Sequence, residues 1–225
     1  MPDTPVVWKD EELTPIRDKV YQYIKQAIVQ GIYKSGDRII ERELADQLNV
    51  SRTPIREALF RLESQGFVKT LPRRGVVVSK LSPEEVIEIF TILSALESLA
   101  TKLAAHKAND THREELDAIV AEIDSALSEP TLKEEHWKFH FKVNDVINRA
   151  SGSPRLTSML DGLSEYIRAF VYLGYELPGR MRKAMEEHRD QARAVRDGEA
   201  ELAENLTKIH VENAKKAFLE ALDKE

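Results

Sequence analysis

The chain of 225 residues contains no cysteine. This excludes disulfide bonds, thiolate metal sites and cysteine nucleophiles, and it fits a reducing compartment. No apolar run approaches the roughly 20 residues that a membrane-spanning helix needs. The first residues, Met1-Pro-Asp-Thr-Pro, lack the basic and apolar regions of a signal peptide. We therefore expect a cytoplasmic protein with no membrane partner.

Charge of the two signs is divided unevenly along the chain. The whole sequence has 33 basic and 39 acidic residues, a net charge of −6, but residues 13–80 hold 13 basic and 7 acidic ones. A basic segment can neutralise phosphates, whereas the acidic remainder would be repelled by them. The division predicts a flexible tail over 1–12, a DNA-binding domain over 13–80 and a second domain over 81–225.

Residues 13–80 show the pattern of a winged helix-turn-helix. The predicted helices cover about 15–31, 41–48 and 52–65, and the predicted strands cover 67–71 and 75–79. Asn49 is expected to end the second helix in a left-handed conformation, and the Ser51 side chain is expected to cap the third. Basic residues at the tip of the strand pair indicate a wing beside the helices. Duplex DNA is the predicted partner.

The candidate DNA contacts lie at the start of the third helix and on the wing. Arg52 and Arg56 fall in its first turns, where a recognition helix meets base edges, and arginine can fork onto guanine. Hydroxyls near a helix start suit phosphate oxygens, and a glycine at the wing tip permits close approach to the minor groove. The complete predicted set is Arg42, Ser51, Arg52, Thr53, Arg56, Arg73, Arg74 and Gly75.

Residues 81–225 show no strand signal, so the fold class is mainly α. Ser82-Pro-Glu-Glu85 reads as a capping box with proline at the first helical position. About six helices are predicted, over 83–107, 111–128, 132–150, 154–175, 179–197 and 200–222. A helical bundle of this length can bury a core and enclose a small-molecule site.

Three histidines of the helical part have a spacing that suggests a shared site. His188 and His210 are 22 residues apart and their midpoint, residue 199, lies beside the break at Asp197-Gly198, so an antiparallel hairpin would place them at one level. His140 and Asn144 are four residues apart and share one helix face. Such a set could hold a divalent metal of the zinc, nickel or manganese class. The alternative is that these are ordinary surface or hydrogen-bonded core histidines.

The motifs resemble those of a known family of regulators. Gly36-Asp-Arg-Ile-Ile-Glu-Arg-Glu-Leu-Ala, Val50-Ser-Arg-Thr-Pro-Ile-Arg-Glu-Ala-Leu and Pro72-Arg-Arg-Gly75 are similar to the GntR-family winged helix-turn-helix. The helical remainder resembles the ligand-sensing domain of the FadR branch. The resemblance implies that the predicted DNA-contacting residues lie where the family contacts DNA. It also implies a homodimeric repressor on a palindromic operator, released by a small metabolite such as an organic acid.

The chain departs from this family at the metal and effector positions. The family often has an Asp-x-x-x-His pair, and here His140 stands in the aspartate position and Asn144 in the histidine position. A second register would make the pair His136 and His140, but it requires four extra residues before Ser151. An arginine that the family uses for acidic ligands, four residues before Glu97, is replaced by Leu93. Arg168 is a candidate effector-binding residue in its place.

Two other functions remain open at the level of the sequence. A metal-dependent enzyme could use the histidine site to activate water, although no general base accompanies the histidines. A sensor without metal could instead use His140, His188 and His210 to hydrogen-bond its effector directly.

Overall fold

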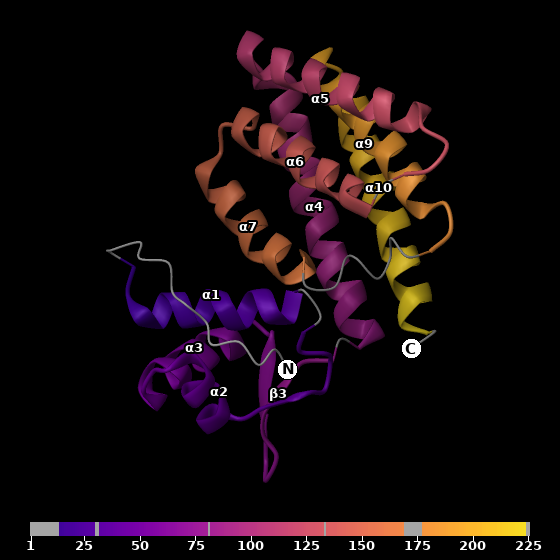
Figure 1. The fold of residues 1–225 in the computed structure, drawn as a ribbon. Helices are drawn as coiled ribbons and strands as arrows, with labels where there is room; N and C mark the ends of the chain where they lie inside the picture. Colours follow the sequence, from indigo (N-terminus) through magenta and orange to yellow (C-terminus); the bar gives the residue numbers. More distant parts are fainter. Residues whose placement is uncertain (1–13, 30–31, 81, 133, 169–176, 224–225) are drawn as a thin grey trace. The chain divides into compact units, whose positions relative to one another are not determined.

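The computed structural model describes residues 14–29, 32–80, 82–132, 134–168 and 177–223. The predicted tail over 1–12 lies outside these residues. The chain divides into two compact units, and the second begins at Ser82 (Figure 1). None of the described helices is long and apolar enough to cross a membrane.

The first unit contains three helices, α1 (Ile16–Val29), α2 (Glu41–Leu48) and α3 (Arg52–Ser64). Asn49 ends α2 with φ of 51°, and its amide donates to the last carbonyls of the helix, as the sequence predicts. Ser51 precedes α3 with an extended backbone, but its side chain makes no capping hydrogen bond. That prediction was wrong because Pro54 occupies the third helical position and has no N–H to offer.

A small antiparallel sheet completes the first unit. Its strands are β1 (Arg38–Ile39), β2 (Val68–Leu71) and β3 (Gly75–Val78), in the order β1-β3-β2. The predicted two-stranded wing is β2–β3, and β1 adds a third strand through the pairing of Arg38 with Val77. A two-residue strand carries no alternation that a sequence pattern could reveal. The core beneath the sheet includes Ile24, Leu44, Leu48, Ile55, Leu59, Leu62, Phe67 and Val78.

The second unit is helical throughout its described residues. Its elements are α4 (Pro83–Lys107), α5 (Asp110–Ser128), the 3₁₀ turn η1 (Glu134–Trp137), α6 (Lys138–Ala150), α7 (Pro154–Arg168), α9 (Arg180–Arg196) and α10 (Ala200–Leu222). The predicted capping box is present, since Ser82 accepts from the Glu85 amide and the Glu85 side chain accepts from the Ser82 amide. The helix expected over 132–150 is instead η1 followed by α6, and the predicted extension of α7 to 175 falls outside the described residues.

Four helices of this unit converge on one buried region. α4 packs along α10, α9 contacts both, and α6 packs against α4 and α9, while α5 covers α6 and α9 (Figure 1). Phe90 of α4 and Phe218 of α10 hold the long pair together with ring centroids 5.9 Å apart. The inward faces of α4, α6, α9 and α10 therefore surround a common interior, and polar side chains on those faces must meet there.

Candidate nucleic-acid interface and metal centre

The start of α3 presents two arginines that share one carboxylate. Arg52 Nη2 and Arg56 Nε donate to Glu41 Oε2 at 2.8 and 2.9 Å, and the arginine side chains remain 56 and 61 % exposed. Partial burial opposes ionisation of Glu41, but hydrogen bonds from both arginines hold its pKa below the usual range. Glu41 thus fixes the two guanidinium groups side by side. Arg42, Ser51 and Thr53 are also exposed.

The wing turns through two residues with positive φ. Arg73 has φ of 64° and Gly75 has φ of 73°, and the Arg74 amide closes the turn on the Leu71 carbonyl. Arg73, Arg74 and Gly75 are all exposed. A Cβ built on Gly75 would lie 3.7 Å from Arg38 Nε, so Arg38 adds its charge beside the wing tip. Sequence reasoning missed Arg38 because it assigned no strand there.

Removing the Glu41 carboxylate tests its effect on the two arginines. In Glu41→Gln we expect affinity for scrambled duplex DNA to rise, because two guanidinium charges lose their partner. The preference for a specific site over scrambled DNA should fall several-fold, because the arginines lose their fixed geometry for base contacts. Fluorescence anisotropy with both duplexes at two salt concentrations measures this ratio. Glu43→Gln is the control, and an equal ratio in the two variants would contradict the prediction.

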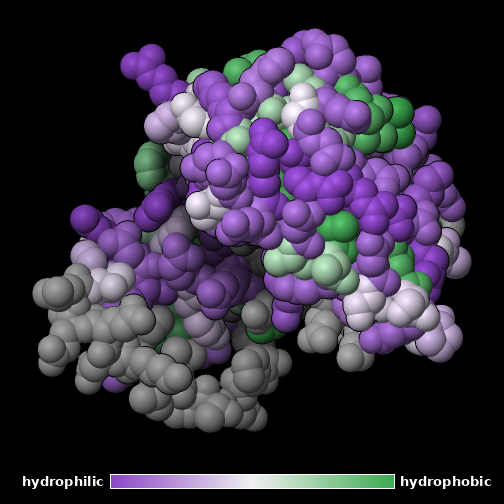
Figure 2. Space-filling model, turned by 90° about the horizontal axis from the view of Figure 1, so that it is seen from above, coloured by the Kyte–Doolittle hydropathy of each residue, from purple (hydrophilic) through white to green (hydrophobic). Residues whose placement is uncertain are grey.

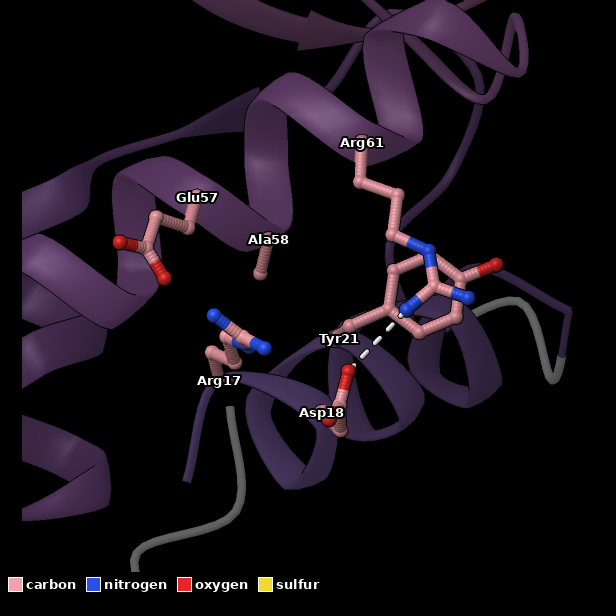
Figure 3. A pocket seen from close by; sticks show the side chains of 6 residues that line it. All are labelled: Arg17, Asp18, Tyr21, Glu57, Ala58 and Arg61. Atoms are coloured by element: carbon pink, nitrogen blue, oxygen red, sulfur yellow. Dashed lines mark hydrogen bonds and ion pairs between the residues drawn. The ribbon is translucent and has the colours of Figure 1, made fainter. Parts of the chain in front are cut away.

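A shallow depression of about 200 Å³ lies between α1 and α3 (Figure 3). Arg61 lies over the Tyr21 ring, 3.9 Å from its centroid, and pairs with Asp18 at 3.2 Å. The Tyr21 hydroxyl donates to Gln65 at 2.6 Å. These contacts hold the C-terminal end of α3 against α1, whereas Arg52 and Arg56 lie in the first turns of the helix.

The second unit brings His140, His188 and His210 together. They come from α6, α9 and α10, and one candidate ligand atom from each lies within 4.8 Å of the others. His140 Nδ1 is 3.1 Å from His188 Nε2, and the His188 and His210 rings are 4.1 Å apart. His188 and His210 are only 2 and 3 % exposed. The structure therefore joins the residues that the sequence paired by spacing.

Neighbouring side chains fix the orientation of the two buried histidines. His210 Nδ1 lies 2.7 Å from Glu187 Oε2, and His188 Nδ1 lies 3.0 Å from Gln191 Oε1. Gln191 Nε2 donates to Thr207 Oγ1 at 3.1 Å, which sets the orientation of the amide. Such partners engage one nitrogen of each ring, so that the other can bind a metal; in His188 that other nitrogen, Nε2, faces His140 Nδ1. Sequence reasoning assigned no role to Glu187, Gln191 or Thr207.

The donor set fits a divalent transition metal. Burial first, and then the neighbouring histidines, lower the pKa of His188 well below its usual value; burial, His140 and Arg180 do the same for His210. The imidazoles are thus in the neutral form that binds metal. Tetrahedral zinc with bonds of about 2.0–2.1 Å separates its nitrogen ligands by about 3.4 Å. The observed separations need only small side-chain shifts to reach that geometry.

Asn144 lies beside this cluster, whereas His136 is not part of it. Asn144 Nδ2 is 3.5 Å from His140 Nε2, the ring nitrogen not engaged with His188, and 3.5 Å from Glu97 Oε1. His136 lies in η1 and packs on the Phe139 ring. The cluster consists of His140, His188 and His210 and does not include His136.

Leu93 and Glu97 of α4 are both buried, and Glu97 lies beside Asn144. Burial raises the pKa of Glu97 to about 8, so its carboxyl is mostly protonated at neutral pH. The Arg168 side chain, which was predicted to bind the effector, lies outside the described side chains.

The Glu97 carboxyl makes stability depend on pH. Its folded pKa is raised, so between an unfolded value of about 4.5 and about 8 the folded chain holds a proton that the unfolded chain has released. Stability is therefore lost as the pH rises. The free energy of unfolding of the wild type minus that of Glu97→Gln should fall by about 3 kcal/mol from about pH 5 to about pH 8. Urea titrations at several pH values measure this difference. If the free energy of unfolding depends on pH in the same way in the two proteins, the prediction is wrong.

Comparison with known protein families now identifies the chain. Residues 16–78 match the bacterial regulatory proteins of the gntR family, and residues 88–213 match the FCD domain. The chain is a GntR-family transcriptional regulator with an FCD domain. The regulator is 29 % identical over 203 residues to the uncharacterised HTH-type transcriptional regulator YdhC of Bacillus subtilis, covering 90 % of this chain and 91 % of the relative.

Other relatives of the regulator have names that refer to repression. It is 29 % identical over 201 residues to a probable D-xylose utilisation operon transcriptional repressor of Paenarthrobacter nicotinovorans, with 88 % of this chain and 86 % of the relative covered. The solved structure of E. coli McbR/YncC shares the fold, with a TM-score of 0.71, 22 % identity and coverage of 92 and 99 % of the two chains. The regulator binds DNA, and the alternative of a metal-dependent enzyme has no support among these matches.

Proposed function

We propose that this regulator is a repressor that binds a palindromic operator as a homodimer. A small molecule that binds at the histidine cluster of the FCD domain would release it. The observation that carries the proposal is the combination, in one chain, of an exposed arginine pair at the start of α3 and a buried, oriented histidine cluster in a separate unit. Repression is favoured by the names of relatives, including the HTH-type transcriptional repressor RspR of E. coli, which is 22 % identical over 212 residues with 89 % of this chain and 92 % of the relative covered.

On DNA, the first unit would divide its contacts between bases and backbone. Arg52 and Arg56 would enter the major groove and contact base edges. Exposed groups near the start of α2 and α3 would hold phosphates, and the wing would lie in the flanking minor groove. The phosphate-binding group is Arg42, Ser51 and Thr53, and the wing group is Arg73, Arg74 and Gly75.

A homodimer would present two recognition helices to the two halves of a palindrome. Exposed apolar side chains on the packed pair α4 and α10 support a self-association surface. Ile92 and Leu99 are seven residues apart on α4, and Leu202 and Ile209 are seven apart on α10, so each pair lies on one side of its helix. The molecular face drawn in Figure 2 is largely hydrophilic and gathers its apolar residues in separate patches. Because its partner is DNA, we expect the regulator to act in the cytoplasm.

Within the FCD domain, His140, His188 and His210 would hold a divalent metal of the zinc, nickel or manganese class, with Asn144 beside them. With three protein ligands, such a metal would keep an open coordination position that could take an oxygen of the effector. Glu187 and Gln191 keep the two buried rings in place for this role. The effector would favour a dimer geometry that no longer matches the operator, through its different affinity for the two states.

Footprinting tests the proposal directly. Purified protein should protect a palindromic segment in the DNA that flanks its own coding region, and protection should weaken steeply with salt. Protection of no discrete segment at any salt concentration would contradict the proposal.

A further inference from the structure

Arg180, the first residue of α9, has an unusual environment for an arginine. Gly179 before it has φ of 79°, and this turn starts the helix so that the Arg180 side chain runs into the interior of the unit. The side chain is only 9 % exposed. Arginine is almost never buried unless it is fully paired, so each of its donors requires a partner.

One terminal nitrogen of Arg180 has no partner among the described residues. Nη1 donates to Glu187 Oε2 at 2.9 Å, whereas Nη2 is inaccessible and makes no hydrogen bond to any described residue. A buried guanidinium N–H without an acceptor is costly, because desolvation of a charged donor is not compensated. The unpaired nitrogen therefore indicates an acceptor supplied by a ligand.

Arg180 lies beside the histidine cluster. Glu187 Oε2 accepts from Arg180 and also lies 2.7 Å from His210 Nδ1, so one carboxylate oxygen joins the arginine to a member of the cluster. The Arg180 charge is also close enough to contribute to the lowered pKa values of both His188 and His210. The other oxygen of Glu187 accepts from Asn213 at 2.7 Å, so both carboxylate oxygens have partners.

We infer that Arg180 binds the carboxylate of a small acidic effector through Nη2, beside the histidine cluster. This rests on the proposed function, since it assigns the chemistry of the ligand to the same site. Nη1 is occupied by Glu187, so the buried and unpaired Nη2 is the nitrogen that would donate to an oxygen of a compact acid.

The test compares charged ligands with neutral ligands of the same shape. Thermal unfolding of zinc-saturated full-length protein is followed with acetate against acetamide and with succinate against succinamide, at constant ionic strength. We expect at least one acid to raise the midpoint of the wild type more than its amide does. In Arg180→Gln this charge-dependent difference should shrink at least fivefold.

Two further variants separate ligand binding from folding. Arg180→Lys keeps the pair with Glu187 through its single nitrogen, and it should fold and lose most of the difference. Arg182→Gln removes an arginine two residues away that donates to the carbonyls of Leu127 and Glu129, and it should retain the difference. Equal response of the wild type to acids and amides, or a full difference in both Arg180 variants, would overturn the inference.

Operator binding by the same proteins, measured without ligand, distinguishes this inference from the proposed function. Arg180→Gln should bind the footprinted duplex as the wild type does, because the substitution lies in the second unit. Charge-selective stabilisation without specific DNA binding would overturn the proposed repressor function and leave the anion site. Specific DNA binding without charge selectivity would overturn the inference about Arg180 and leave the proposed function intact.

Discussion

The His188→Ala/His210→Ala variant is expected to lose tight metal binding. The wild type should retain about one zinc, nickel or manganese ion per chain, and the variant less than about a tenth of that, because two of three clustered imidazoles are removed. Zinc at about 100 times its dissociation constant should stabilise the wild type by about 2.7 kcal/mol and leave the variant unchanged. Elemental analysis and thermal unfolding with added zinc measure the two effects.

Two single substitutions, one near the cluster and one outside it, test the site further. Glu187→Gln keeps the shape of the side chain but removes the carboxylate beside His210, and it should weaken zinc binding by about 10–100-fold. His106→Ala removes an exposed histidine outside the cluster and should bind zinc normally. Equal metal content in the double variant and the wild type would show that the three histidines do not form the metal site.

The second large effect is expected in the first unit. Arg52→Ala/Arg56→Ala should bind its operator at least about 100-fold more weakly, because each arginine–guanine contact is worth about 1–3 kcal/mol. Neither side chain is part of a core, since both are exposed and contact Glu41. Helix content and oligomeric state should therefore not change. Anisotropy titrations with the footprinted duplex measure the loss.

Arg61→Ala is the matched control for this variant. Arg61 lies on the same helix and is half-exposed, but it pairs with Asp18 and covers Tyr21 instead of facing Glu41. Its removal should leave operator affinity within a few-fold of the wild type. If Arg52→Ala and Arg56→Ala each bind the operator as tightly as the wild type, α3 is not the recognition helix.

The sequence predicted those parts of the structure that depend on local pattern and regular spacing. The helices of both units follow from apolar periodicity and from capping residues such as Asn49 and Ser82. The meeting of His188 with His210 follows from their spacing, because the midpoint between them lies beside the break at Gly198. In each case, the residues that determine the feature lie in one continuous stretch of the sequence.

Features that depend on contacts between distant residues were not predictable in this way. Strand β1 exists because Arg38 and Ile39 pair with β3, and Ser51 fails as a cap because of a proline three residues later. Glu187 and Arg180 become part of the histidine site only when α9 and α10 pack together. A single buried arginine has no periodic signal, so its role appears only in three dimensions.

Native mass spectrometry of the regulator with its footprinted duplex tests the central claim most directly, because it counts chains and metal ions in one complex. The account predicts two chains of 25.7 kDa on one palindromic duplex, with about one divalent metal retained per chain. Addition of a carboxylate that stabilises the wild type should convert this complex into free duplex and free dimer. A single chain per duplex, or a two-chain complex that carries no metal, would contradict it.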